Sequence, residues 1–196
     1  MEKITRLAVM ASGNGTNFAA LLAYIKQAKL PVEIVRLVVD HDDVKVIDLA
    51  KEAQVPVFTI NYKDYPNRET AEKQILQQLA DDEIDGILLA GYMRILTPQF
   101  VKVYPQKIIN IHPALLPSFP GRHGIDDAYN YGVKVTGVTI HFVNDGVDSG
   151  KIIAQEPVRI EDDDSLDSLE VKIHAVEHKL YPKTLQKLIK EGVFKS

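Results

Sequence analysis

The chain has 196 residues, of which 45% are hydrophobic and 26% charged, values that are typical of one globular domain. It contains no cysteine, which excludes disulfides, thiolate catalysis and cysteine metal sites. The net charge of −4 gives the chain as a whole no basic footprint for nucleic acid. Residues 1–6 lack the apolar core of a signal peptide, and no run is long enough to span a membrane, so a cytoplasmic protein is expected.

Short apolar runs alternate with helical patterns in the first half of the chain. Ile4–Met10 is expected to form a buried strand that runs directly into a glycine-rich turn. The apolar positions 18, 21, 22 and 25 then follow helical spacing. Further strands are expected at 34–39, 57–60, 84–90 and 108–111, with helices at 46–51, 68–81 and 98–103. This alternation predicts a mostly parallel sheet that helices cover on both faces.

The second half has a different pattern. Residues 134–142 and 151–160 alternate apolar and polar side chains across a short polar connection, which predicts two antiparallel strands. A long helix is expected after the acidic run 161–164, with Ser165 as its N-cap and Pro182 kinking or dividing it. The expected fold is therefore α/β: a Rossmann-like three-layer fold with a mostly parallel sheet and antiparallel strands in the C-terminal half.

The loop Ser12–Asn17 joins the first expected strand to the first helix. Glycines at such a position let the backbone approach an anion, and the helix N-terminus supplies free amide donors. The loop departs from a dinucleotide fingerprint because Phe18 stands at its third glycine, although Asp40 does end the second strand. The loop also lacks the Gly-Lys-Ser/Thr of a nucleotide-binding P-loop. A single phosphate is the favoured ligand, and a turn that merely needs glycine is the alternative.

Asn110 and His112 lie two residues apart at the end of the fifth expected strand, so they share one face of the sheet. Asp148 follows later in a loop rich in Asn, Asp and Gly, and could bring a carboxylate beside His112. A neighbouring carboxylate raises the pKa of a histidine, which would keep an imidazolium available as a general acid. An asparagine amide is a suitable oxyanion donor. The group suits direct transfer of a carbonyl group to an amine, although a turn and a structural histidine are the alternatives.

Polar side chains also interrupt the last helix. His174 and His178 stand four residues apart, but no third ligand completes a zinc motif, so surface or structural roles are favoured. Glu177 falls on or near the apolar stripe of the helix. Such a carboxylate could bind a polar group of a substrate or make a buried hydrogen bond. The acidic run before the helix is interpreted as a solvated loop whose carboxylates favour the helix dipole.

Several motifs, taken in order, resemble those of the phosphoribosylglycinamide formyltransferases, a branch of the folate-dependent formyltransferase family. They are Ser12–Asn17 (SGNGTN), Leu89–Leu96 (LAGYMRIL), Asn110–Pro117 (NIHPALLP), His141–Asp148 (HFVNDGVD) and the pair Glu177-His178. The resemblance spans essentially the whole chain. The Asn-x-His-Pro segment and the later Asp occur throughout the wider family, whereas the glycine loop indicates the glycinamide ribonucleotide branch.

The resemblance implies a reaction and a role for each matching residue. The formyl group of 10-formyltetrahydrofolate, a cosubstrate, would pass to the amine of phosphoribosylglycinamide, with no metal. The catalytic residues would be Asn110, His112 and Asp148. The phosphoribosylglycinamide would be bound by Gly13, Asn14, Gly15, Thr16, Asn17 and Glu177. The folate would be bound by Arg68, Met93, Arg94, Ile95, Leu96, Asn110, Asn144, Asp145, Gly146, Val147 and Asp148. Ile125 stands where some relatives carry a second histidine, so the loop around His123 is given no catalytic role.

A single formyltransferase domain is expected over 1–196, with a phosphate-binding half at 1–105 and a catalytic and folate-binding half at 106–196. Its expected partners are small-molecule substrates, with neither nucleic acid nor a membrane, for a monomer or weak homodimer. The competing hypotheses are a 10-formyltetrahydrofolate hydrolase, a nicotinamide-binding oxidoreductase and a non-catalytic ligand-binding module.

Overall fold

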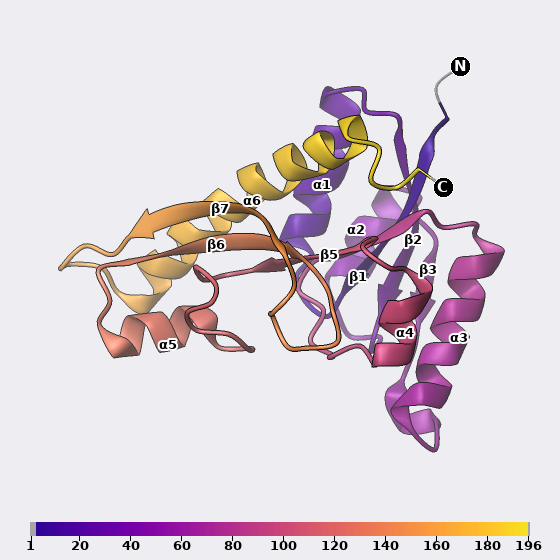
Figure 1. Ribbon diagram of the computed structural model, residues 1–196, viewed down its shortest axis with the longest axis horizontal. Coiled ribbons are helices and arrows are strands. Elements are labelled where there is room, and N and C mark those ends of the chain that lie inside the picture. Colours follow the sequence, from indigo (N-terminus) through magenta and orange to yellow (C-terminus); the bar gives the residue numbers. More distant parts are fainter. Residues whose placement is uncertain (1–2, 196) are drawn as a thin grey trace.

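The computed structural model describes residues 3–195, so Met1, Glu2 and Ser196, which the one-domain prediction includes, lie outside it. Its centre is a seven-stranded sheet of order β3-β2-β1-β4-β5-β6-β7 (Figure 1). The strands are β1 (Thr5–Ala11), β2 (Val32–Val39), β3 (Val57–Thr59), β4 (Gly86–Leu89), β5 (Ile108–His112), β6 (Val135–Phe142) and β7 (Ile152–Arg159). The strands β1 to β5 are parallel, whereas β6 and β7 pair antiparallel, as the sequence predicts.

Helices cover both faces of this sheet. They are α1 (Thr16–Gln27), α2 (Val46–Glu52), α3 (Arg68–Asp81), α4 (Pro98–Val103), α5 (Gly124–Tyr131) and α6 (Leu166–Lys190), with a 3-10 turn η1 (Tyr62–Asp64). Apolar side chains of α1, α2, α5 and α6 share one buried cluster with the sheet, and those of α3 and α4 share a second. The predicted three-layer fold is therefore confirmed.

The strand order places one crevice at the carboxyl edge of the sheet. The strand β1 pairs with β2 on one side and with β4 on the other. The strands β2 and β3 thus extend the sheet in one direction from β1, and β4 and those after it extend the sheet in the other. Ligands of open α/β sheets bind outside such a switch point. The glycine loop follows β1 at this edge, and Asn110 and His112 end β5 at the same edge.

The long helix α6 is continuous from Leu166 to Lys190, so the prediction that Pro182 divides it is wrong. A proline removes one hydrogen bond from a helix, but here its surroundings offset that loss. Pro182 is buried, and the hydroxyl of the adjacent, fully buried Tyr181 lies 3.0 Å from the carbonyl oxygens of Leu89 and Ile109. These contacts fix the helix to the middle of the sheet.

The N-terminus of α6 agrees with the sequence. The Ser165 side chain accepts a hydrogen bond from the Ser168 amide, as an N-cap does. In the acidic loop that precedes it, Asp164 lies 2.5 Å from Lys172 Nζ and also accepts from the Ser168 hydroxyl. The short helices α5 and η1 were not expected, because each has too few residues to show a helical period.

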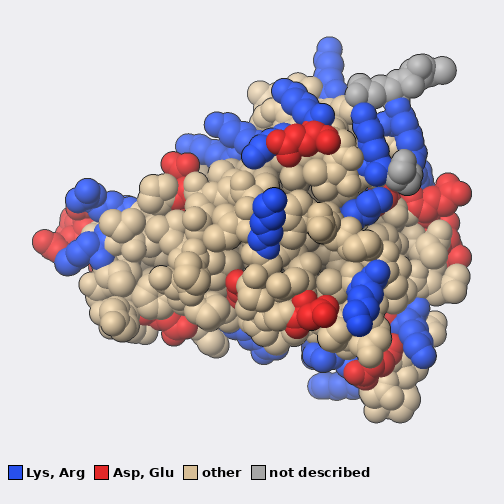
Figure 2. Space-filling model, in the orientation of Figure 1, with Lys and Arg blue, Asp and Glu red and all other residues tan. Residues whose placement is uncertain are grey.

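The surface carries both signs of charge. Basic and acidic side chains are interspersed on the face shown in Figure 2, and much of its middle is uncharged. Across residues 3–195, no helix has both the length and the apolar character needed to cross a membrane.

Candidate active site

One large cavity opens at the carboxyl edge of the sheet, with a volume of about 550 Å³. That size suits small-molecule sites, which commonly measure about 300–1,000 Å³. Six segments distant in sequence contribute lining residues: the glycine loop, residues 89–96, residues 110–113 at the end of β5, residues 121–126, residues 141–148, and α6. The cavity therefore brings together the motifs that the sequence singles out.

The glycine loop is shaped by Gly15, which is the N-cap of α1 and has a φ of 76°. A Cβ atom added there would lie 2.5 Å from Cγ2 of Val46, so the position excludes any side chain. Gly13, by contrast, has no atom within 4 Å of a Cβ built on it, and it lines the cavity. The loop thus presents bare backbone and a helix N-terminus to the cavity, the arrangement that binds a phosphate.

Two features argue against a dinucleotide in this loop. Phe18 stands where a dinucleotide fingerprint has its third glycine, and its side chain is fully buried in the core beneath α1. Asp40, the candidate ribose acid, accepts a hydrogen bond from Arg94 Nε at 2.8 Å. The carboxylate is therefore engaged within the protein, which disfavours the nicotinamide hypothesis.

Glu177 connects α6 to the glycine loop. One of its carboxylate oxygens accepts from Asn17 Nδ2 at 3.0 Å and from His174 Nδ1 at 2.9 Å, and its side chain is buried. The hydrogen bond to Glu177 raises the pKa of His174. Glu177 is buried like Ile173 and Tyr181 on the same helix, so the interpretation that it falls on or near the apolar stripe is confirmed, and it also lines the cavity.

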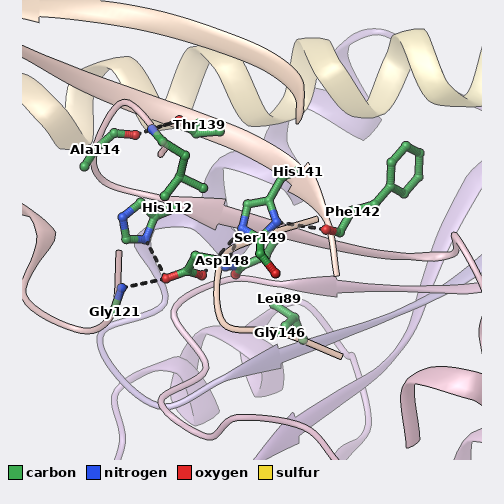
Figure 3. Close-up of polar contacts among 12 residues, drawn as sticks. Leu89, His112, Ala114, Gly121, Thr139, His141, Phe142, Gly146, Asp148 and Ser149 are labelled. Carbon is green, nitrogen blue, oxygen red and sulfur yellow. Dashed lines mark hydrogen bonds and ion pairs between the residues drawn. The ribbon is translucent and has the colours of Figure 1, made fainter. Parts of the chain in front are cut away.

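Asn110, His112 and Asp148 all line the cavity. Figure 3 shows the Asp148 carboxylate between the rings of His112 and His141. His112 Nδ1 lies 3.4 Å from Asp148 Oδ2, and its Nε2 donates to the Phe119 carbonyl at 2.8 Å. The amide nitrogen of Asn110 lies 3.2 Å from His141 Nε2. This contact uses one amide hydrogen and leaves the second for a ligand. The spacing of Asn110 and His112 does place both residues on one face.

The prediction that Asp148 raises the pKa of His112 above its ordinary value is wrong. The imidazole is only 3% exposed, and burial lowers its pKa below 6.5 despite the opposing effect of Asp148. Desolvation disfavours the charged ring by more than one carboxylate at 3.4 Å favours it. The imidazolium is consequently a minor form near neutral pH. New negative charge beside the ring would favour its protonation.

Asp148 is held in place from two sides. The Gly121 amide donates to its Oδ2 at 2.7 Å, and His141 Nε2 lies 3.6 Å from its Oδ1. Burial raises the pKa of Asp148, but the adjacent His141 ring and the hydrogen bond from the Gly121 amide outweigh burial and lower the pKa overall. Asp148 therefore remains a carboxylate at neutral pH. Through the Gly121 amide, the loop before α5 holds the Asp148 carboxylate in place and takes no catalytic role itself.

Sequence reasoning missed His141, which is only 2% exposed and joins Asn110 to Asp148. Its Nδ1 donates to the carbonyl of the adjacent Phe142 at 2.9 Å, which leaves Nε2 to face the other two residues. The antiparallel register pairs His141 directly with Asn110. Aligning the two expected strands would have revealed this pairing.

The residues expected at the folate site divide into two groups. The cavity is lined by Met93, Arg94, Ile95 and Leu96, and also by Asn144, Gly146 and Val147. Asp145 and Arg68 are exposed and do not line it. Arg68 Nη1 donates to the Ile95 carbonyl at 3.1 Å, so this side chain contacts the segment that lines the cavity.

This fold, with a glycine-rich loop and an Asn–His–Asp cluster lining one cavity, is that of a group-transfer enzyme. The family model described as "Formyl transferase" matches residues 5–185, and the chain belongs to that family.

The relatives within the family are consistent with one another. The phosphoribosylglycinamide formyltransferase of Bacillus subtilis is 42% identical over 184 residues, which cover 94% of each chain. The crystal structure of the phosphoribosylglycinamide formyltransferase from Bacillus halodurans has a TM-score of 0.95 and 46% identity, covering 98% of this chain and all of that one. The glycinamide ribonucleotide transformylase 1 of Geobacillus kaustophilus has a TM-score of 0.92 and 47% identity, covering 94% and 98%.

Proposed function

We propose that this chain transfers the formyl group of 10-formyltetrahydrofolate to the amine of N1-(5-phosphoribosyl)glycinamide, giving the N-formyl product and tetrahydrofolate in de novo purine (IMP) biosynthesis. The observation that carries the proposal is the meeting of Asn110, His112 and Asp148 in the same cavity as the glycine loop. The names of the relatives support transfer to the amine rather than hydrolysis of the formyl donor.

The phosphoribosylglycinamide occupies the side of the cavity formed by the glycine loop and α6. Its phosphate binds to the backbone of residues 13–17 and the N-terminus of α1, where the helix dipole favours an anion. Glu177 accepts from the ribose hydroxyls, because its carboxylate is already oriented by Asn17 and His174. The Asn17 Oδ1 is buried and has no hydrogen-bond partner among residues 3–195, so it can accept from a ligand.

The formyl donor occupies the opposite side, between residues 93–96 and 144–148. The exposed apolar side chains there, Met93, Ile95 and Val147, are 49–50% exposed and offer the planar ring system an apolar surface. The donor's formyl carbon then lies at the Asn110–His112–Asp148 cluster. No metal takes part in this arrangement, since amide, imidazolium and carboxylate groups supply the chemistry.

The transfer proceeds through a tetrahedral adduct. The amine nitrogen forms a bond to the formyl carbon, and the carbonyl electron pair moves onto oxygen. That oxyanion accepts from the Asn110 amide and from Nδ1 of the protonated His112, while Asp148 stabilises the imidazolium. The bond to the folate nitrogen then breaks. That nitrogen gains one proton as the attacking amine loses one, with His112 or a water as the relay.

The test is an assay of the purified protein with both substrates and with each omitted in turn. The proposal requires formylated product and tetrahydrofolate in equal amounts, and only when both substrates are present. Formate release without the amine substrate would instead identify a hydrolase, and absence of turnover with both would leave a binding module.

We also propose that residues 1–105 hold the phosphate end of the substrate and that residues 106–196 supply the catalytic group, within one formyltransferase domain. We further propose a cytoplasmic location and a monomer or weak homodimer. Cell fractionation and sedimentation of the purified protein test these two points.

A further inference from the structure

Asp40 is a buried carboxylate that the reaction does not use. It follows β2 at the carboxyl edge of the sheet, is 4% exposed and does not line the cavity. Its Oδ2 accepts from Arg94 Nε at 2.8 Å, and its Oδ1 lies 2.9 Å from His41 Nδ1. Burying a carboxylate costs free energy unless partners compensate. Its position therefore calls for a functional explanation.

Arg94 belongs to the segment 91–96, which lines the cavity beside the proposed formyl donor. Its guanidinium carbon lies 4.9 Å from the centre of the Tyr62 ring, and the Tyr62 hydroxyl lies 3.0 Å from that of Tyr92. The ion pair with Asp40 and the contact with Tyr62 thus determine where the Arg94 side chain lies. They anchor this wall of the cavity to β2 and η1.

Ser12 connects the glycine loop to the segment that carries Arg94. Its hydroxyl oxygen accepts from the Met93 amide at 3.0 Å, and its own amide donates to the Gly91 carbonyl at 3.0 Å. Met93 directly precedes Arg94, the partner of Asp40. The start of the glycine loop is therefore held to the same segment that Asp40 holds.

The two proposed subsites consequently share one support. Asp40 accepts from Arg94 in the folate-lining segment, and the amide of the preceding Met93 donates to Ser12 at the start of the glycine loop. A neutral side chain at position 40 would weaken the hold on Arg94, because charge-assisted hydrogen bonds are about twice as strong as neutral ones. The segment that bonds to Ser12 would then be held less firmly.

We propose that Asp40 is a positioning residue that fixes the phosphate-binding loop relative to the folate-lining segment, so that the amine and the formyl carbon meet at reacting distance. The inference rests on the formyl transfer proposed above. A loss of alignment of about 1 Å between reactants can cost roughly a hundredfold in rate.

The experiment compares Asp40→Asn with the wild-type enzyme in steady-state assays that vary each substrate in turn. We expect the KM for the formyl donor to rise at least about fivefold and kcat to fall about tenfold. Asp82→Asn is the matched control, because Asp82 is also in a partly buried ion pair, with Arg36 Nε 2.7 Å from its Oδ2, and does not line the cavity. This control is expected to lose stability while both KM values and kcat stay within about twofold of wild type.

Ser12→Ala covers the case in which Asp40→Asn does not fold, since it removes only one hydroxyl. It is expected to raise the KM for the formyl donor about two- to fivefold. The inference is overturned if a folded Asp40→Asn enzyme keeps both KM values and kcat within twofold, if Ser12→Ala does so when Asp40→Asn does not fold, or if Asp82→Asn changes the kinetics as much as Asp40→Asn. A wild-type enzyme that transfers no formyl group refutes the proposed function instead, so the two failures are distinguishable.

Discussion

The amide nitrogen of Asn110 lies 3.2 Å from Nε2 of His141, its direct partner in the antiparallel pairing of β5 with β6. The Nδ1 of His141 donates to the Phe142 carbonyl, so its Nε2 is the ring nitrogen that faces the Asn110 amide. One amide hydrogen of Asn110 is thereby fixed, and the other is directed by the same planar group. His141 thus orients the proposed oxyanion donor.

Replacing His141 with alanine is expected to lower kcat roughly ten- to a hundredfold, because Asn110 loses its acceptor and Asp148 loses a neighbour. The assay must run well below the unfolding temperature, since the site is buried. His141→Gln, whose amide oxygen can accept from Asn110, is the control and should recover part of the activity. Equal activity of His141→Ala and wild type would show that Asn110 needs no such support.

Replacing Asp148 with asparagine is expected to lower the pKa of His112 further. Burial already lowers that pKa, and the negative charge of Asp148 opposes the effect of burial, so its removal leaves burial less opposed. The measurement is an NMR titration of the His112 ring protons, assigned by their absence in His112→Asn. An unchanged or higher pKa in Asp148→Asn would contradict the account of this pair.

The free energy of unfolding should fall on acidification partly because of His112. The pKa of His112 in the folded state is below the ordinary 6.5, so between these values the unfolded chain binds more protons. Stability is therefore lost as the pH falls through 6.5, by at most about 1.4 kcal/mol per pH unit for one group.

Urea denaturation at pH 7.5 and pH 5.5 tests this dependence, and His112→Asn should lose less stability between the two. The lowered pKa of His178 also reduces stability on acidification, whereas the raised pKa of His174 increases it. Both residues remain in the variant, so they do not affect the comparison. The lowered pKa values of Asp40 and Asp148 confine their contribution to pH below about 4. A decline in His112→Asn as steep as in wild type would contradict the prediction.

Gly15→Ala should destabilise the protein by about 2 kcal/mol or more. The residue has a positive φ, and the new methyl group would lie 2.5 Å from Val46. Gly13→Ala is the matched control, because its Cβ meets nothing within 4 Å, and it should change stability by less than about 1 kcal/mol. Thermal or urea unfolding of both variants decides the point, and equal losses would contradict it.

Sequence patterns predicted those parts of the fold that depend on neighbouring residues along the chain. The helix expected at 68–81 forms over Arg68–Asp81, because its period and its ends are both visible in the sequence. Local rules predicted that Pro182 kinks or divides the last helix, but α6 is not divided there, and the adjacent Tyr181 is held by the sheet. The helix α5 has eight residues after a stretch rich in proline and glycine, too few for its period to be recognised.

The candidate site likewise contains features that the sequence could predict and features that it could not. The residues that share a motif or a strand face, such as Asn110 and His112, could be predicted from spacing. Contacts between distant segments could not be predicted from spacing. The pairing of His141 with Asn110 depends on strand register. The pairing of Asp40 with Arg94 depends on the order of the strands at the switch point of the sheet. The direction of the His112 pKa shift depends on burial, which spacing does not reveal.

The rate of formyl transfer by His112→Ala tests the central claim most directly. A single-turnover measurement with both substrates saturating separates this rate from binding and product release. Loss of the acid that stabilises the oxyanion is expected to lower the rate by roughly a hundredfold or more, with the fold intact by circular dichroism. Near-normal transfer by this variant would contradict the assignment of the reaction to Asn110, His112 and Asp148.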